Sequence, residues 1–352
     1  MAPRPLNGLT LEELTVELKS RARAVEALKW LYALPLLPAT LPETIPEVSH
    51  RVWRPFAKAH GLSAPVIRDR QTSPDGTTKY ALDFGGATVE AVRIPSKDRS
   101  TVCISSQAGC TRRCAFCATK ELGFVRHLTA EEMVAQYLVA RAEAPEQRPA
   151  SNVVFMGMGE PFDNLDEVLR AVEVLTQGPK PQLRQASVTV STSGVLPGLR
   201  RFLAESRASL ALSLNATTDE VRTLVMPHNK TWPIASLLDE LRLDAAKNGA
   251  RRETLIEYVL FENLNDSDDD ADRLVALLRD VPSRVNLIPY NPYPGTSLRT
   301  PSEARVAGFH ERVVQQGQLC LVRWPRGREI AAACGQLARS AGGAGFGPTA
   351  LG

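Results

Sequence analysis

The stretch that decides the fold is "TVCISSQAGCTRRCAFCATKELGF", residues 101–124. It holds four of the six cysteines of the chain, namely Cys103, Cys110, Cys114 and Cys117. Three and then two residues separate the last three cysteines, and the aromatic Phe116 directly precedes the final one. Cysteines gathered this closely in a chain that has few of them are typical of metal ligands.

The kind of metal follows from the spacing. A structural zinc site needs a fourth ligand, which Cys103 could supply, but such sites usually use two separated Cys-x-x-Cys pairs and no second pair exists here. Three unrelated core cysteines are disfavoured by the neighbouring "TRR". An iron–sulfur cluster held by three thiolates, with one iron left open, fits better. The spacing resembles the signature of radical S-adenosylmethionine (SAM) enzymes, in which the open iron binds SAM. The sequence therefore predicts a [4Fe-4S] cluster on Cys110, Cys114 and Cys117.

Composition indicates an ordinary globular protein, since 43% of the 352 residues are apolar and 23% are charged. The sequence has no apolar run long enough to span a bilayer and no secretory signal, so we expect a cytoplasmic protein without a membrane partner. The net charge of +3 does not by itself suggest nucleic acid. Residues 1–70 hold ten Lys or Arg against seven Asp or Glu, which fits either a solvated surface or a module that binds an acidic polymer.

The first part of the chain predicts a small helical module, residues 1–75. Helical patterns cover residues 10–20, with Thr10 as N-cap, then 23–34 and 48–60. Two alternating runs, "KYALDF" and "ATVEAVRI", follow on either side of a Gly-Gly pair and predict a β-hairpin extension, residues 76–97.

The main part of the chain, residues 98–340, predicts an α/β core. Six short apolar runs are each followed by a helical stretch, which favours a parallel sheet with both faces covered. The runs are "TVCIS", "NVVFMG", "SVTVST", "SLALSL", "TLIEYVLF" and "RVNLIPY". Helices are expected at 129–143, 165–176, 234–248, 268–278 and 302–316. The Gly- and Ala-rich tail, residues 341–352, is expected to be disordered.

Polar residues follow several of these strands, at the edge where parallel α/β folds carry their active sites. The turn "FMGMGEPFDN" contains Gly159 and Glu160. Alone it is equally well explained as a tight strand-to-helix turn. Beside the cysteine motif it resembles the Gly-Glu-Pro element of radical SAM enzymes, where the Glu and the backbone receive the SAM ammonium group, a suitable partner for a carboxylate.

Three cysteines remain outside the predicted cluster. Cys320 lies in the apolar "QLCLVRW" and is expected in the core. Cys103 and Cys334 are separate thiols near a radical-generating cluster, which suggests that they form covalent bonds with a substrate during catalysis. Spacing alone favours the simpler interpretation of each as a buried thiol without a role.

The chain closely resembles the RlmN/Cfr family of dual-specificity RNA methyltransferases. The resemblance rests on the ordered segments "CISSQAGC", "FMGMGEP", "VTVSTSGV", "SLNATTDEVR", "NLIPYNPYPG" and "AACGQLA". It extends from about residue 86 to residue 338 and is looser in the N-terminal module. It implies a radical SAM partial (β/α)6 barrel with a small N-terminal helical accessory, RNA-binding domain and a β-hairpin extension. The acidic run 268–270 matches a helix start in the family, so we assign it no catalytic or metal-binding role.

The resemblance also implies a mechanism that uses two SAM molecules per turnover. The first methylates Cys334. The second, cleaved at the reduced cluster, yields a radical that removes a hydrogen from this methyl group, and the carbon radical adds to adenine. Cys103 then attacks the sulfur of Cys334, which forms a transient disulfide and releases the methylated RNA. Glu90 matches the position of the proton acceptor, although without the family match a Glu on a hairpin strand is usually solvated. The implied SAM contacts are Gly159, Glu160, Ser191, Ser213, Leu214, Asn215 and Asn291.

Two branches of the family methylate carbon 2 or carbon 8 of adenine. "MGMGEPF" and "NLIPYNP" resemble the carbon-2 branch, which implies adenosine in 23S ribosomal RNA as substrate, with transfer RNA as a further candidate. Asn215 departs from the His that many carbon-2 enzymes carry, and "RWPRG" departs from the usual Arg-x-Thr-Arg-Gly. The basic residues expected near phosphate are Arg112, Arg113, Lys120, Arg126, Arg323, Arg326 and Arg328.

The remaining expected partner is a low-potential electron donor. We expect the protein to be a monomer. Two other interpretations stay open. A radical SAM reaction on a small molecule or a protein would leave Cys103 and Cys334 dispensable, and a zinc-stabilised RNA-binding protein would have no catalytic activity.

Overall fold

The computed structural model describes residues 3–177, 183–249 and 252–337. Its main element is a ten-stranded sheet whose seven strands after β3 run parallel, in the order of the chain. These strands are β4 (Ser100–Cys103), β7 (Ala150–Phe155), β8 (Val188–Thr192), β9 (Ser209–Ser213), β10 (Thr254–Leu260), β11 (Ser283–Pro289) and β12 (Cys320–Val322). The six predicted strands are confirmed, and β12 adds a seventh around the buried Cys320.

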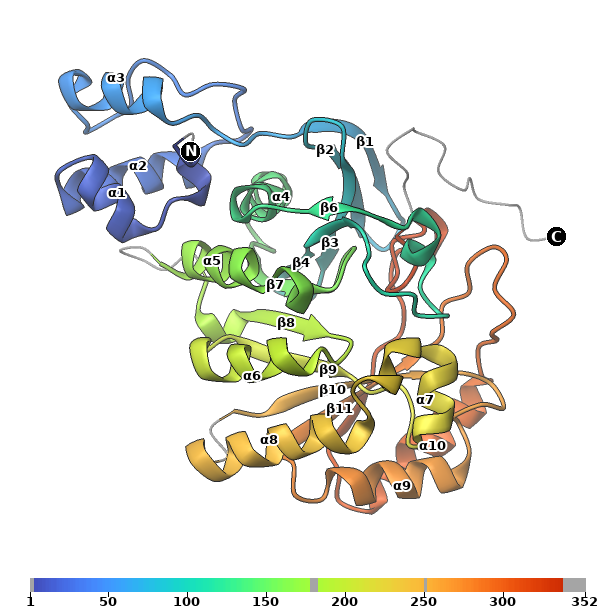
Figure 1. The fold of residues 1–352 in the computed structure, drawn as a ribbon. Coiled ribbons are helices and arrows are strands. Elements are labelled where there is room, and N and C mark those ends of the chain that lie inside the picture. The colour runs from blue at the N-terminus through green and yellow to red at the C-terminus, as the bar shows by residue number, and fades with distance from the viewer. Residues whose placement is uncertain (1–2, 178–182, 250–251, 338–352) are drawn as a thin grey trace.

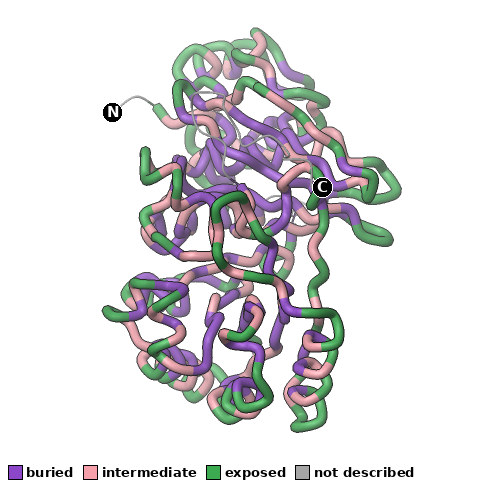
Figure 2. Tube along the Cα trace, turned by 90° about the vertical axis from the view of Figure 1, so that its right-hand side faces the viewer, coloured by how far each residue is buried: buried purple, intermediate pink, exposed green. Residues whose placement is uncertain are grey.

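Helices cover the outside of this curved sheet (Figure 1). They are α4 (Ala130–Ala142), α5 (Leu165–Thr176), α6 (Leu196–Glu205), α7 (Asp219–Val225), α8 (Ile234–Asn248), α9 (Asp268–Leu278) and α10 (Glu303–Gln315). All five expected helices are present within one residue of their predicted ends, whereas α6 and α7 were not anticipated. The strands are buried through most of their length (Figure 2), as expected for a radical SAM α/β barrel core.

The extension before the barrel is larger than the predicted hairpin. β2 (Thr78–Asp83) and β3 (Thr88–Pro95) form the expected antiparallel pair, but β1 (Val66–Thr72) adds a third strand beside β2. The three-stranded meander therefore begins before residue 76, the predicted start of the extension. β1 reads "VIRDRQT" with no buried residue, and an edge strand of this kind lacks the apolar alternation that reveals a strand in sequence.

The N-terminal helices are α1 (Leu11–Glu17), α2 (Arg21–Ala33) and α3 (His50–Ala59), as the patterns predict. Thr10 and Glu13 form a capping box at the start of α1. The chain before α1 is attached to the barrel, because the guanidinium of Arg4 lies 2.8 Å from carboxylate oxygens of both Glu131 on α4 and Glu167 on α5. The expected tail, 341–352, lies outside the described residues. Within the described ranges, no helix has the length and apolar character needed to cross a membrane.

Candidate active site

The three clustered cysteines lie on a loop that a small hairpin closes. β5 (Gln107–Gly109) pairs antiparallel with β6 (Phe124–His127), and the amide of Cys110 donates to the carbonyl of Gly123 at 2.9 Å. A 3-10 turn, η2 (Ala118–Leu122), completes the connection. The loop therefore has both ends fixed, which holds its thiols at the carboxyl edge of the barrel strands.

All three thiols line one cavity of about 160 Å³. The other walls come from the ends of β7 through β11 and from the segment after β12. Residues that share this cavity include Arg112, Gly159, Glu160, Ser191, Thr192, Ser193, Ser213, Asn215, Glu257, Asn291 and Cys334. The structure thus brings together the predicted cluster ligands, the predicted methyl-accepting cysteine and six of the seven predicted SAM contacts.

The donor set fits an iron–sulfur cluster. Burial raises the pKa of the Cys110 thiol to about 12 and that of Cys114 well above its usual range, and a positively charged metal centre in the same site would favour their thiolate forms. The ring centroids of Phe116 and Phe261 lie 5.7 Å apart, in an apolar cluster beside the cysteine loop that also contains Cys114. In the described part of the chain no three ligand side chains converge on a single ion. Ligands of a cluster need not converge in this way, because each binds a different iron.

The Gly-Glu turn is built against the cluster loop. Gly159 has a φ of +99°, and a Cβ at this position would lie 2.6 Å from the Cβ of Gln107, so only glycine fits. The fully buried Gln107 accepts hydrogen bonds from the amides of Glu160 at 3.0 Å and Thr111 at 3.3 Å. Gln107 is therefore the link between the cysteine loop and the Gly-Glu turn, a role that sequence reasoning missed.

Glu160 is buried and its carboxylate is already fully hydrogen-bonded. Oε1 accepts from Thr192 Oγ1 at 2.8 Å and from the Phe162 amide at 2.9 Å. Oε2 accepts from the amide of Ser193 at 2.8 Å and from its hydroxyl at 2.6 Å. Burial raises the pKa of Glu160, and these donors act against that rise. Since a carboxylate offers about four acceptor positions, Glu160 can attract a cation in the cavity by its charge rather than by a free lone pair.

The predicted contacts at the strand ends lie where expected, with one exception. Ser191, Ser213 and Asn291 stand at or just after the ends of β8, β9 and β11 and line the cavity. Leu214 is fully buried and does not line it. The side-chain amide of Asn291 reaches the carbonyl of Cys334 at 3.5 Å, so this residue also contacts the segment that carries Cys334.

Asn215 has a constrained geometry. Its φ is +59°, a region that asparagine tolerates better than most residues. Its Oδ1 accepts from the amide of Val259 at 2.9 Å, and its carbonyl accepts from Asn265 Nδ2 at 2.8 Å. The residue that departs from the family's histidine therefore joins the ends of β9 and β10 and presents only its remaining surface to the cavity.

The two thiols outside the cluster lie near each other. Cys334 is an exposed residue that lines the cavity, and the protein atoms packed around its sulfur, followed by the charge of Glu257, raise the pKa of the thiol to about 11. Cys103 is buried at the end of β4, where burial and the nearby Cys334 thiol raise its pKa. Both are free thiols, so the transient disulfide that the resemblance implies is not present in this structure.

Glu90 is not the solvated residue that its hairpin position suggested. It is 1% exposed on β3, and the ammonium of Lys79 lies 3.0 Å from its Oε1. Its carbonyl accepts from the hydroxyl of Ser105, at 2.7 Å, and that hydroxyl in turn accepts from the amide of Met158. Glu90 does not line the cavity, but this chain of bonds connects β3 to the Gly-Glu turn.

Two further titratable groups at or near the cavity were missed. Glu257 lies inside the apolar run of β10, where its pKa rises to about 7 through burial although Asn286 donates to Oε1 at 2.8 Å. His228 has its Nε2 2.9 Å from the carbonyl of Ser193, and burial lowers its pKa to about 4. Nothing in the sequence distinguishes either residue from an ordinary strand or loop position.

The expected basic residues fall into two groups. Arg112 and Arg126 are occupied within the protein, by Asp163 and by Glu132 respectively, and Lys120 lies 3.6 Å from Glu121. The exposed members are Arg113, Arg323, Arg326 and Arg328. Within the same "RWPRG" segment, Trp324 leaves 52% of its surface exposed.

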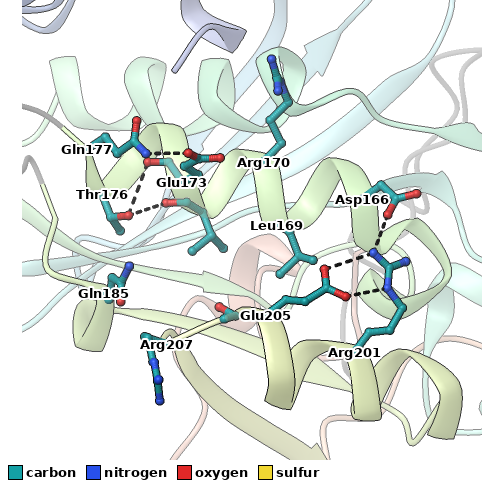
Figure 3. Close-up of a pocket in the computed structure, with 12 residues that line it drawn as sticks. Asp166, Leu169, Arg170, Glu173, Thr176, Gln177, Gln185, Arg201, Glu205 and Arg207 are labelled. Atoms are coloured by element: carbon teal, nitrogen blue, oxygen red, sulfur yellow. Dashed lines mark hydrogen bonds and ion pairs between the residues drawn. The ribbon is translucent and has the colours of Figure 1, made fainter. Parts of the chain in front are cut away.

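A larger hollow of about 640 Å³ lies elsewhere, between α5 and α6 (Figure 3). Its side chains are largely paired with one another, as Arg201 is with both Asp166 and Glu205. None of the cysteines lines it. The smaller cavity, which the reactive groups line, is therefore the candidate active site.

Comparison with known proteins agrees with this arrangement. The model of the radical SAM superfamily matches residues 104–275. The dual-specificity RNA methyltransferase RlmN of Methylocella silvestris is 41% identical over 96% of this chain and 91% of its own length. The chain belongs to the RlmN family. The RlmN protein of Geobacter sulfurreducens is similarly 40% identical, over 94% of this chain and 91% of its own.

The RlmN assignment extends to the three-dimensional structure. A radical SAM methyltransferase from Sphaerobacter thermophilus, 36% identical, superposes with a TM-score of 0.86 over 95% of this chain and 99% of its own. The predicted radical SAM fold is thus confirmed. Membership of the radical SAM superfamily implies a [4Fe-4S] cluster and SAM, and the cavity described above has donors suited to both.

Proposed function

We propose that this RlmN-family enzyme methylates carbon 2 of adenine in RNA by way of a methylated Cys334. One observation carries the proposal: three thiols suited to a cluster, the strand-end polar residues and Cys334 share a single cavity, with Cys103 close behind Cys334. A radical SAM enzyme acting on another substrate would have no need of this additional pair of thiols.

The cofactors have assigned places in this proposal. Cys110, Cys114 and Cys117 hold the cluster, which when loaded with SAM supplies a methyl group and a hydrogen-abstracting radical, two SAM molecules being used in each turnover. Gly159, Ser191, Ser213, Asn215 and Asn291 line the space for SAM, Leu214 supports that space from behind, and the charge of Glu160 attracts the ammonium group.

The covalent work falls to two thiols and one carboxylate. Cys334 accepts the methyl group and delivers its carbon to the adenine ring, which is electron-poor at carbon 2 and resists alkylation by a methyl cation donor. Cys103 then attacks the sulfur of Cys334: the S–S bond forms, the bond from that sulfur to the methylene carbon breaks, and the electron pair left on this carbon takes up a proton, so that the methylated RNA is released. Glu90 takes the proton lost from the adenine ring, since it is a buried carboxylate tied through Lys79 to the segment that carries Cys334.

The RNA substrate is 23S ribosomal RNA, with transfer RNA as a second substrate. The target adenine leaves its stack to enter the cavity. Trp324 and the exposed arginines of the same segment offer a stacking surface and phosphate contacts outside it. The N-terminal helical module helps to bind the RNA. The enzyme acts in the cytoplasm as a monomer and receives electrons from a low-potential donor.

The test is mass spectrometry of RNA after reaction. Protein reconstituted without oxygen would be incubated with SAM, a reductant and ribosomal or transfer RNA from a strain that lacks this enzyme class. A methyl group at carbon 2 is expected, and Cys334→Ala should abolish it while the cluster remains. Cys320→Ala, which removes a buried thiol outside the cavity, should keep it.

Other outcomes would replace the proposal. A methyl group at carbon 8 would move the enzyme to the other branch. SAM cleavage without RNA methylation would point to a different radical substrate, and a colourless protein that binds zinc and RNA would remove the catalytic role.

A further inference from the structure

The segment that carries Cys334 is bonded to the cluster loop and to the chain after β11, where Gln336 Nε2 donates to the Pro292 carbonyl at 2.9 Å and Arg328 Nε to Asn291 Oδ1 at 3.4 Å. The amide of Ala118 donates to the carbonyl of Gly335 at 2.7 Å, and the hydroxyl of Thr119 donates to the carbonyl of Leu337 at 2.7 Å. Asn291 reaches the carbonyl of Cys334 at 3.5 Å. Apart from the bond of Arg328, these contacts act on Cys334 itself or on the residues after it.

The residues before Cys334 are also held by the antiparallel extension. The carboxylate of Asp75, in the turn between β1 and β2, accepts from the amide of Gly327 at 3.2 Å. The ammonium of Lys79 on β2 donates to the carbonyl of Ala331 at 3.3 Å. Ala331 has a φ of +49°, a conformation that alanine rarely adopts and that persists only when its surroundings fix it. The meander therefore fixes the backbone three residues ahead of the reactive sulfur.

Lys79 also contacts Glu90. Its ammonium lies 3.0 Å from the Glu90 carboxylate, with side-chain exposures of 12% for Lys79 and 1% for Glu90. A charged pair so far from water keeps a narrow geometry, because each partner needs the other. One nitrogen thus joins the carboxylate on β3 to the backbone that leads to Cys334.

We propose that Lys79 is a positioning residue that sets the distance between the Glu90 carboxylate and the segment carrying Cys334. This inference deepens the proposed function and rests on it for the roles of Glu90 and Cys334. Asp75 is the second anchor of the same segment, but it does not touch Glu90. The β1–β2–β3 meander thereby acts as the frame on which proton acceptor and methyl carrier are aligned.

A simpler role for Lys79 is charge compensation of a buried carboxylate, and the two roles predict different behaviour. Compensation alone predicts that removal of both charges, in Lys79→Met/Glu90→Gln, leaves the segment 327–337 as well held as in Glu90→Gln alone. Positioning predicts that the double variant loosens this segment, because the bond to the Ala331 carbonyl is lost in either case.

The first measurement is hydrogen–deuterium exchange in the cluster-loaded protein. Residues 327–337 in Lys79→Met/Glu90→Gln should exchange about tenfold faster than in Glu90→Gln, as expected for the loss of one hydrogen bond to a charged group. The peptide of α4, residues 130–142, serves as internal reference. Lys29→Met, which removes an exposed lysine paired with Glu26, should change neither peptide. Equal exchange in the two Glu90 variants would overturn the proposal.

The second measurement is the ratio of covalent enzyme–RNA adduct to methylated RNA. In Lys79→Met the carboxylate is displaced, so adduct should accumulate relative to product by about 100-fold, the low end of what a positioned general base contributes. Asp75→Ala should loosen the segment and lower both species without raising their ratio. Adduct and product that fall together in Lys79→Met would overturn the positioning role, as would a Lys79→Met ratio equal to that of Asp75→Ala.

Failure of the proposed function would look different. Wild-type protein would then form neither adduct nor methylated RNA, while the exchange experiment would still report whether Lys79 holds the segment.

Discussion

At Asn215, backbone conformation and side-chain bonding are combined in one residue. The left-handed φ of +59° favours Asn or Gly, and the amide oxygen satisfies the buried backbone N–H of Val259. Neither requirement is visible in the sequence, where Asn215 stands only as a departure from a histidine. Local geometry therefore explains why an asparagine serves at this position.

Replacement of Asn215 separates these two contributions. Asn215→Ala should lower the free energy of unfolding by roughly 3 kcal/mol, because it strains the backbone and leaves the Val259 N–H without an acceptor. Asn215→Gly should lose roughly 2 kcal/mol, since glycine relieves the strain alone. Urea unfolding measures both, and equal losses would show that the backbone conformation carries no strain.

Trp324 is the residue at which RNA binding can be tested without disturbing the core, because half of its surface is exposed. Trp324→Ala should weaken RNA binding by about 1–3 kcal/mol, the scale of one base stacked on an aromatic ring. Cluster content and SAM cleavage should not change, and Trp324→Phe should recover most of the affinity. Filter binding at one fixed salt concentration is the measurement, and unchanged affinity would place RNA elsewhere.

At the scale of elements, the hairpin that carries the cluster loop depends on Gln107. Gln107→Ala would leave the buried amide of Glu160 and the partly buried amide of Thr111 without their acceptor. We expect a loss of roughly 2–4 kcal/mol in stability and fewer iron atoms per chain after reconstitution. Iron analysis and visible absorbance measure the second effect. Gln315→Ala, at an exposed position on α10, is the control, and full iron content in Gln107→Ala would contradict this role.

Elements with strong local signals could be predicted from the sequence. The six apolar strands, the cysteine loop and the capped start of α9 follow from periodicity, spacing and capping residues. β1 could not be found because its residues alternate without a buried face, and α6 was obscured by Pro197 and Gly198 in its first turn.

The site could be predicted only where a motif marks it. The three cluster cysteines, Cys334 and the Gly-Glu turn lie in recognisable segments, and the structure brings them to one cavity. Gln107 and Lys79 matter through contacts with residues distant in the chain or across a sheet, which no local pattern encodes. Glu257 is hidden in an apolar strand, because sequence does not reveal which face of a strand meets the cavity.

At the scale of the whole molecule, two buried groups should oppose each other in the dependence of stability on pH. His228 has a native pKa of about 4, below its usual 6.5, so the unfolded chain binds more protons and stability rises with pH between these values. Glu257 has a native pKa of about 7, above its usual 4.5, so the native state binds more protons and stability falls as pH rises through that window.

Single substitutions should therefore tilt the profile in opposite directions. Relative to the wild type, Glu257→Gln should gain stability and His228→Gln should lose it as pH rises from 4.5 to 7, each by roughly 2 to 3 kcal/mol. Urea unfolding of the cluster-free protein at several pH values measures this. Three parallel profiles would mean that neither group is held in its buried protonation state.

The order of the strands has a consequence for biosynthesis. From β4 to β12 the sheet follows the order of the chain, so each strand can join as the ribosome releases it. The cluster ligands are translated early, whereas Cys334 follows every strand of the barrel. A message interrupted just after β12 would yield a barrel with the proposed cluster ligands but without Cys334, the proposed methyl acceptor. If Cys334 has its proposed role, translation of residues 323–334 thus decides whether the polypeptide can methylate RNA or only consume SAM.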